Sequence, residues 1–234
     1  MGLKYRFDSF ARRRLRHWFE FVGSARYSRP GLDGLDRRLA KYLDYRGGYY
    51  IEAGANDGYS QSNTYYLERF RGWSGVLIEP VPALFERCCR ERARSKVFNC
   101  ALIDREDPRR TVTIHYADLM SFVHGSFENV EQEKARVNEA MRVQALRSTY
   151  TVEVPAQTMT DVLVAAAAPR RIDFLSLDVE GVEASVLRGL DLERFQIDFI
   201  LVETRFSREA ESILAERYDV ADSSFPHDLL LRRR

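Results

Sequence analysis

The amino-acid sequence predicts an α/β protein built around a mostly parallel, doubly wound sheet. From residue 49 onward, short runs of β-branched and aromatic residues alternate with amphipathic stretches, and such a sheet requires this alternation. The chain has 234 residues, a length that suits one domain of this class with modest additions. Its hydrophobic share of 45% is sufficient to bury a core.

The expected strands and helices follow one another in a regular order. Strands are expected at 49–53, 75–79, 96–101, 111–116, 150–154, 172–178 and 199–203, and helices at 62–70, 82–94, 182–190 and 208–216. The last two strand candidates, 217–221 and 228–232, are separated by a turn-rich stretch at 223–226, so we expect them to form an antiparallel pair. The charged, helix-prone stretch within 117–148 predicts a helical insertion in a domain that covers 46–234.

Residues 1–45 differ in composition from the rest of the chain. Residues 1–30 carry eight Lys or Arg against two acids, a charge of +6. Phe7, Phe10, Leu15 and Trp18 recur among the arginines at roughly helical spacing. We therefore expect a basic helical extension whose aromatic stripe packs on its own domain or on a second copy of the chain. Peripheral contact of residues 5–22 with a membrane surface is the alternative.

Composition also excludes several classes of protein. The net charge of the whole chain is +1, which leaves the remainder at −5, and a mildly acidic domain does not suit a nucleic-acid binder. The three cysteines, Cys88, Cys89 and Cys100, form neither a disulfide framework nor a zinc-binding spacing. No apolar run is long enough to cross a bilayer, and no signal-peptide core is present. We expect a cytoplasmic protein.

A glycine-rich turn follows the first expected strand. Gly54 and Gly58 flank this turn, and glycine lets the backbone bend sharply and come close to a ligand. The helix start that follows offers N–H groups to a polar ligand. Glu79 ends the second strand about 25 residues after Gly54, where an acid accepts hydrogen bonds from ribose hydroxyls in nucleotide-binding sheets. Together these features predict a site for a nucleoside.

The nature of the turn favours a nucleoside without phosphates. A dinucleotide site would have a second glycine at position 56, where it lets the pyrophosphate approach, but this chain has Asn56. S-adenosylmethionine fits instead, because its ribose suits Glu79 and its amino-acid end carries an ammonium group. An acid such as Glu52 or Asp57 near that ammonium would stabilise it.

With these motifs, the sequence resembles the FkbM family of methyltransferases over roughly residues 48–205. The matching segments are IEAGANDGYSQSNTYYLE at 51–68, GVLIEPVPALFERC at 75–88, VFNCALID at 97–104, MTDVL at 159–163, IDFLSLDVEGVEASVLRGL at 172–190 and FILVET at 199–204. The resemblance implies a Rossmann-like class I methyltransferase fold, S-adenosylmethionine as methyl donor, and O-methylation of a sugar, glycan or natural product. The stretch 117–148 matches no family pattern.

The resemblance also implies roles for individual residues. Those expected to hold the methionine part of the cofactor are Glu52, Gly54, Asn56 and Asp57. Glu79 would bind the ribose, and the segment from Asn99 to Ala101 would border the adenine. Asp178 and Glu180 would lie near the methyl group. The family often has Asp where this chain has Glu52, which is a conservative change.

Chemistry at the acceptor needs a group that can take the hydroxyl proton. Asp178 and Glu180 end a strand and point the same way, at the edge where open α/β sheets bind ligands. His124 lies in a loop-like stretch and has the intrinsic pKa of a general base, with a surface loop histidine as the alternative. Glu203 ends the next strand and is also suitably placed. We expect no metal, although Mg²⁺ could in principle bind these acids.

Three other functions compete with this hypothesis. The same pattern of strands, turn and helices would also fit an NAD-dependent oxidoreductase, but Asn56 and the lack of a second domain disfavour that function. A nucleic-acid methyltransferase is supported only by the basic extension. A catalytically inactive, methyltransferase-like scaffold is disfavoured by the intact turn and by Glu79.

Overall fold

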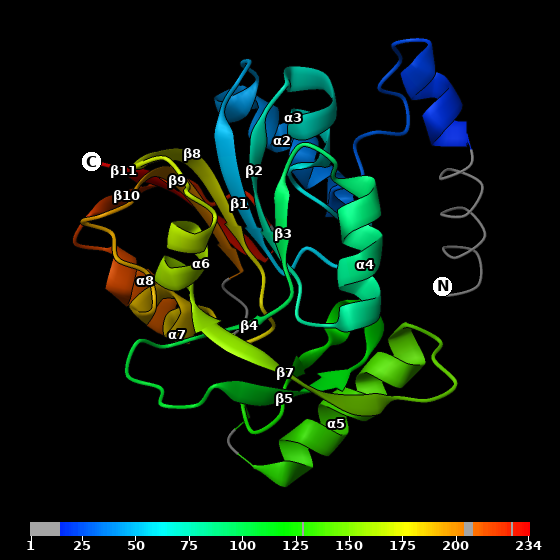
Figure 1. Ribbon diagram of the computed structural model, residues 1–234, viewed down its shortest axis with the longest axis vertical. Helices are drawn as coiled ribbons and strands as arrows, with labels where there is room; N and C mark the ends of the chain where they lie inside the picture. The colour runs from blue at the N-terminus through cyan, green and yellow to red at the C-terminus, as the bar shows by residue number, and fades with distance from the viewer. Residues whose placement is uncertain (1–14, 128, 204–207, 226) are drawn as a thin grey trace.

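A seven-stranded sheet forms the centre of the molecule in a computed structural model that describes residues 15–127, 129–203, 208–225 and 227–234 (Figure 1). Its parallel strands are β1 (Tyr49–Ala53), β2 (Ser74–Ile78), β3 (Lys96–Phe98), β8 (Arg171–Leu177) and β9 (Gln196–Glu203). β11 (Asp228–Arg233) pairs antiparallel with β9, and β10 (Tyr218–Asp222) pairs antiparallel with β11. The strand order is β10-β11-β9-β8-β1-β2-β3. This confirms the expected mostly parallel sheet with an antiparallel pair at its C-terminal end.

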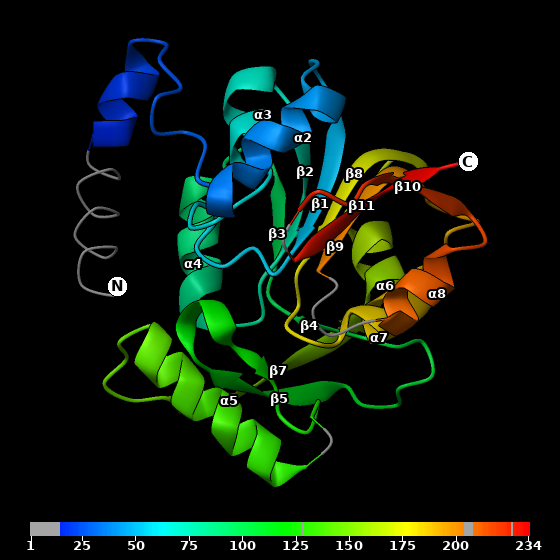
Figure 2. The ribbon, with the colours of Figure 1, turned by 180° about the vertical axis from the view of Figure 1, so that it is seen from behind.

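Helices cover both faces of this sheet (Figures 1 and 2). One face packs against α2 (Leu35–Leu43), α3 (Tyr65–Arg71) and α4 (Pro82–Glu91). The other face packs against α6 (Met159–Ala165), α7 (Glu183–Arg188) and α8 (Arg208–Leu214). Alternate strand residues face the two layers, as with Tyr50 and Ile51 of β1. Because both faces are buried, the central strands are almost continuously apolar.

A second, four-stranded sheet lies beyond the carboxyl ends of the central strands. It consists of β4 (Ala101–Ile103), β5 (Thr111–Tyr116), β6 (Phe122–Val123) and β7 (Tyr150–Thr158), in the order β4-β7-β5-β6. Within 117–148 the chain forms the short 3₁₀ helix η2 (Asp118–Met120), β6 and the helix α5 (Val130–Val143). In both views α5 lies beside β5 and β7 (Figures 1 and 2). The segment 117–148 therefore contributes to a layer over one edge of the central sheet.

The single strand expected at 96–101 is wrong, because the chain changes sheets at this point. β3 ends at Phe98, and Ala101 begins β4, where it pairs with Ala156 of β7. Asn99 lies at the break, and its Nδ2 donates to the carbonyl oxygens of Glu79 and Pro80 at 2.9 and 2.8 Å. The side chain thus replaces strand hydrogen bonds and turns the chain toward the second sheet.

The N-terminal region packs on the domain in a way that differs from expectation. Residues 15–21 are helical, and Arg16 on this helix donates to both carboxylate oxygens of Glu91, at 2.6 and 2.8 Å. Leu15 and Trp18 are exposed. The expectation that their apolar stripe packs on its own domain is therefore wrong for these two residues. Phe7 and Phe10, the rest of that stripe, lie outside the described residues.

No helix in the described ranges has the length and apolar character that a membrane span requires.

Candidate active site

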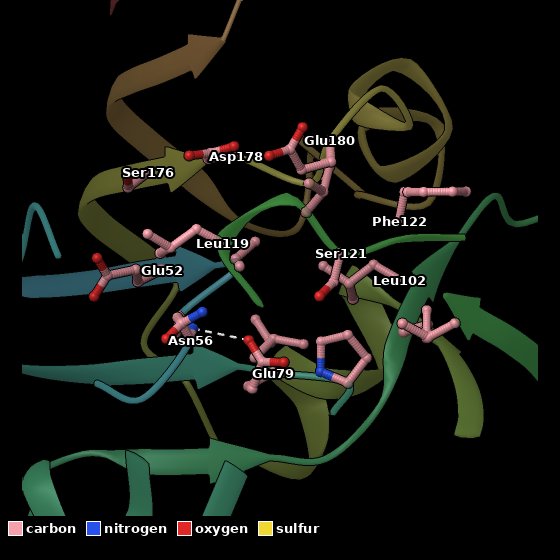
Figure 3. A pocket seen from close by; sticks show the side chains of 18 of the residues that line it. Glu52, Asn56, Glu79, Leu102, Leu119, Ser121, Phe122, Ser176, Asp178 and Glu180 are labelled. Carbon is pink, nitrogen blue, oxygen red and sulfur yellow. Dashed lines mark hydrogen bonds between the residues drawn. The ribbon is translucent and has the colours of Figure 1, made fainter. Parts of the chain in front are cut away.

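A pocket lies at the carboxyl ends of β1, β2 and β8, covered by β5 and β6 of the second sheet. Its empty volume, including solvent at the mouth, is about 960 Å³. Of the residues expected to form the site, those that line it are Glu52, Gly54, Asn56, Glu79, Ala101, Asp178 and Glu180. Figure 3 shows Glu79 on one side of the pocket, with Asp178 and Glu180 on the opposite side. The tertiary structure thus brings together residues from three strand ends.

Gly54 is the position where the turn needs glycine. Its φ is +85°, and a Cβ there would lie 1.9 Å from the carbonyl oxygen of Asp178. The first strand and the DVEG segment therefore approach each other more closely than any side chain allows. Asn56 also has a positive φ, of 47°, a conformation that asparagine tolerates better than most residues. Its Oδ1 accepts a hydrogen bond from the Asp57 N–H at 2.7 Å.

Glu79 is held in place by the backbone of two loops. Its Oε2 accepts the N–H of Asn56 at 2.8 Å, and its Oε1 accepts the N–H of Val81 at 2.9 Å (Figure 3). The side chain is buried, and burial raises its pKa to about 7 even though both N–H groups favour the charged form. Each oxygen keeps a lone pair for a further donor, such as a ribose hydroxyl.

Glu52 lines the pocket but is occupied by the loop that precedes α3. Its Oε1 accepts the N–H of Asn63 at 3.0 Å, and its Oε2 accepts the Ser62 hydroxyl at 2.9 Å. Oε2 also receives Nη1 of Arg92 at 3.1 Å. The carboxylate therefore positions the 62–64 loop, which explains why α3 begins at Tyr65 and not at the expected residue 62.

Two expected cofactor-binding residues do not line the pocket. The carboxylate of Asp57 accepts the N–H groups of Tyr59 and Ser60, at 3.1 and 2.8 Å, and so closes the glycine-rich turn. Asn99 is used at the break between β3 and β4. Both side chains support residues that line the pocket and are not themselves among the lining residues.

Asp178 lies at the end of β8 and is surrounded by other acids. Its carboxyl group shares a hydrogen bond with that of Glu203 at the end of β9. Burial raises its pKa well above the usual value, and the carboxyl groups of Glu203, Glu183 and Asp228 add to this shift. Burial and the neighbouring carboxyl groups thus both favour the protonated form of Asp178.

Glu180 is held above the same pocket by a residue from α5. It adopts a positive φ of 57° and forms an ion pair with Arg136. Burial and the charge of Asp178 raise its pKa to about 7, and Arg136 opposes that shift. Oε1 of the fully buried Glu183 accepts the N–H groups of Val179 and Gly181, at 3.3 and 3.0 Å. These contacts fix the loop that presents Asp178 and Glu180 together.

His124 lies outside the pocket. Its side chain is 59% exposed, and its Nδ1 is 3.0 Å from a carboxylate oxygen of Glu133 on α5. The neighbouring Phe122 and Val123 line the pocket, but His124 does not. The role of His124 as a base stays a prediction, and its place outside the lining does not support it.

Two residues that shape the site were not predicted from the sequence. Arg92, at the end of α4, is fully buried and donates to Glu52, Glu68 and the carbonyl oxygen of Gly58. Asn63 lines the pocket and donates to Ser176, while its buried Oδ1 has no hydrogen-bond partner within the described part of the chain. In the sequence, Arg92 looks like a charged residue on the exposed side of an amphipathic helix. Asn63 belongs to no motif whose spacing indicates a binding site.

The pocket lining fits S-adenosylmethionine. Among the described residues that line it there is no Lys, Arg or His, so nothing there would neutralise a pyrophosphate. Glu79 can accept from ribose hydroxyls, and Asn63 Oδ1 can accept from an ammonium group. Ile78, Ala101 and Leu102 supply apolar surface for a base. Within the described ranges, no cluster of three or more His, Cys, Asp or Glu could hold a metal ion.

Fold and pocket together define a class I methyltransferase. The profile of the Methyltransferase FkbM domain matches residues 52–230, more than half of the chain. The chain therefore belongs to the FkbM methyltransferase family and is an enzyme that uses S-adenosylmethionine. Methyltransferase 1 of Beauveria bassiana (strain ARSEF 2860) is 25% identical over 205 residues, which is 80% of this chain and 81% of that protein. The oxidoreductase alternative is thereby excluded.

Solved methyltransferase structures show a distant likeness. A TehB-like SAM-dependent methyltransferase from Corynebacterium glutamicum ATCC 13032 has a TM-score of 0.39 and 12% identity, covering 99% of this chain and 100% of that one. Precorrin-6y C5,15-methyltransferase from Geobacter metallireducens GS-15 has a TM-score of 0.41 and 8% identity, covering 85% and 87%. Values this low leave the acceptor open.

Proposed function

We propose that this methyltransferase acts on a hydroxyl group of a sugar, glycan or natural product. The observation that carries the proposal is a second cavity, with polar and apolar walls, that shares Asp178 and Glu180 with the cofactor pocket. Its empty volume, including open solvent, is about 1350 Å³. A bound acceptor would thus reach the carboxyl ends of β8 and β9 from the side opposite Glu79.

Three separate parts of the chain form the walls of this acceptor cavity. Leu32, Leu35 and Arg38 come from the N-terminal region, and Arg136 and Glu139 come from α5; the strand ends contribute Asp178, Glu203 and Asp228. Arg136 forms ion pairs with Glu180 and Glu139, and Arg38 donates to the carbonyl oxygen of Ser224. The lining combines six acidic residues with two arginines and several apolar side chains.

The acidic lining favours acceptors that donate hydrogen bonds. Carboxylates accept from hydroxyl groups, which sugars and polyols have in number. The acidic side chains of the lining outnumber its two arginines, and Arg136 is already paired with Glu139 and Glu180, so the cavity suits a neutral acceptor better than a nucleic acid, a nucleotide or a sugar phosphate. This supports a small hydroxyl-bearing acceptor and agrees with the acidic charge of residues 31–234.

The chain's own residues can align the acceptor and take its proton. Bound S-adenosylmethionine supplies a methyl group already activated on a cationic sulfur. Asp178 lies where the cofactor pocket and this cavity meet, and its carboxylate form can accept a hydrogen bond from the acceptor hydroxyl and take its proton. The raised pKa of Asp178 makes it a stronger base than an ordinary aspartate. Positioning by the cavity walls would supply much of the remaining rate.

The experiment measures cofactor binding and methyl transfer separately. Calorimetry with S-adenosylhomocysteine tests the cofactor site, and release of this product is measured with neutral sugars, amino sugars and sugar phosphates as acceptors. Asp178→Asn should slow single-turnover transfer by about 10²–10⁴-fold with unchanged cofactor affinity. Asp219→Asn, an exposed carboxyl on β10, is the matched control and should have no effect. Unchanged transfer in Asp178→Asn, or transfer to phosphorylated acceptors alone, would overturn the proposal.

A further inference from the structure

The helix at residues 15–21 presents its apolar side to solvent. Trp18 is 60% exposed and Phe21 is 89% exposed, with Leu15 and Val22 also exposed beside them. Leu15, Trp18 and Phe21 follow one another at intervals of three residues, which places them on one side of the helix. An amphipathic helix normally buries this face, so its exposure indicates a partner outside the described chain.

The opposite side of this helix is fixed to the domain by charged contacts. The Arg16 guanidinium is 1% exposed; it binds Glu91 and lies 4.0 Å above the centre of the Tyr59 ring. Glu20 accepts hydrogen bonds from Tyr65 at 2.8 Å and from Arg69 at 2.9 Å. Turning the helix to bury Trp18 would break these contacts and leave Arg16 and Glu20 without their partners. The outward direction of the apolar side is therefore built into the fold.

The sequence that precedes this helix is strongly basic. Residues 1–14 contain Lys4, Arg6 and Arg12–Arg14 against a single acid. The helix lies at one corner of the molecule, well away from the central sheet (Figures 1 and 2). A flat surface could thus reach it without meeting the rest of the domain.

The charge of the chain distinguishes two candidate partners for this apolar side, a second copy of the chain and a membrane surface. In a twofold dimer the same patch meets itself, so the dimer would join two chains at a helix that lies within a stretch, residues 1–30, of charge +6 in each chain. An anionic lipid surface has the complementary charge, and each Lys or Arg near such a surface adds about 1 kcal/mol of attraction. Trp and Phe beside Arg are also the side chains that insert at the boundary between headgroups and acyl chains.

We propose that residues 15–22 dock this enzyme on an anionic membrane surface, with Trp18 and Phe21 inserted at the interface. The inference concerns where the protein binds and does not depend on the identity of the acceptor. It predicts peripheral attachment that weakens as salt screens the charges.

Trp18 provides a direct probe of this contact. The chain has two tryptophans, and Trp73 is fully buried, with its Nε1 donating to the Tyr45 carbonyl oxygen at 2.8 Å. A blue shift of emission on adding vesicles, and quenching by brominated acyl chains, would therefore report Trp18. The full chain is mixed with vesicles of phosphatidylcholine alone or with added phosphatidylglycerol. Co-sedimentation measures binding, and sedimentation velocity measures oligomeric state.

The expected result is binding to phosphatidylglycerol vesicles with quenching of Trp18, and little binding to phosphatidylcholine. The double variant Trp18→Ser, Phe21→Ser should lose about tenfold or more of this affinity. The control, Val130→Ser with Val220→Ser, removes exposed apolar side chains elsewhere and should bind as the unaltered chain does. If the double variant fails to fold, quenching in the unaltered chain decides.

Two results would overturn the proposal. Absence of binding and quenching with phosphatidylglycerol vesicles would do so. So would a homodimer that the double variant dissociates while vesicle binding stays the same, because the apolar side would then be occupied by a second copy.

Discussion

Protonation of Glu79 should weaken cofactor binding as the pH falls. The ionised carboxylate accepts the N–H groups of Asn56 and Val81 and keeps lone pairs for ribose hydroxyls. A proton on either oxygen would face one of these N–H groups and would remove an acceptor from the ribose. Because burial raises the pKa of Glu79 to about 7, this change falls in a range that is easily measured.

The size of the effect follows from the ionised fraction. With a pKa of about 7, about nine-tenths of Glu79 is ionised at about pH 8 and about one-tenth at about pH 6. The affinity is therefore present above the pKa and is lost below it. The Kd for S-adenosylhomocysteine should rise about tenfold between these two pH values.

Calorimetry with S-adenosylhomocysteine at several pH values measures this dependence. Glu79→Gln should remove the slope and weaken binding by about 1.5–3 kcal/mol at pH 8, as expected for hydrogen bonds to a charged group. Asp118→Asn is the matched control, because Asp118 lines the pocket and its charge raises the pKa of Glu79. It should keep the slope and move its midpoint to lower pH. An equal Kd at both pH values, or an unchanged slope in Glu79→Gln, would refute the reasoning.

Three further substitutions test the framework of the site. Gly54→Ala should abolish binding of S-adenosylhomocysteine, because the new Cβ would lie 1.9 Å from a backbone oxygen; normal binding by calorimetry would contradict this. Arg92→Met should lower the free energy of unfolding in urea by about 3–5 kcal/mol, because it leaves the buried carboxylates of Glu52 and Glu68 without their cationic partner. A loss below about 1 kcal/mol would contradict this. Arg136→Ala should speed amide hydrogen exchange in α5, because it removes the ion pair to Glu180; unchanged exchange would show that other contacts hold this helix.

The elements with a clear local signal were predictable. β1, β5 and the antiparallel pair β10–β11 occur where runs of strand-forming residues end in turn-forming residues. Gly54 and Glu79 were found because each follows a strand at the position where parallel sheets bind ligands. Both signals depend on residues a few positions apart, and so they can be read along the chain.

Other features depend on residues far apart in the sequence. Arg92 lies at the end of a helix that looks amphipathic, and only its distant partners Glu52 and Glu68 make its burial favourable. The break at Asn99 could not be foreseen, because strand periodicity does not say which sheet a strand joins. His124 had the right chemistry for a base, but its distance from Asp178 is a property of the folded chain.

By itself, the sequence determined the α/β class, the glycine-rich turn, the acid at the end of the second strand and the family, because each depends on local spacing along the strands and turns. Only the tertiary structure decided where the proposed acceptor cavity lies, since its lining comes from segments far apart in the sequence, among them 32–38, α5 and the strand ends. It also decided that the helix at 15–21 faces the domain with Arg16 and solvent with Trp18. Helical spacing shows that a helix has two faces. Which face is buried depends on the partners that the rest of the fold provides.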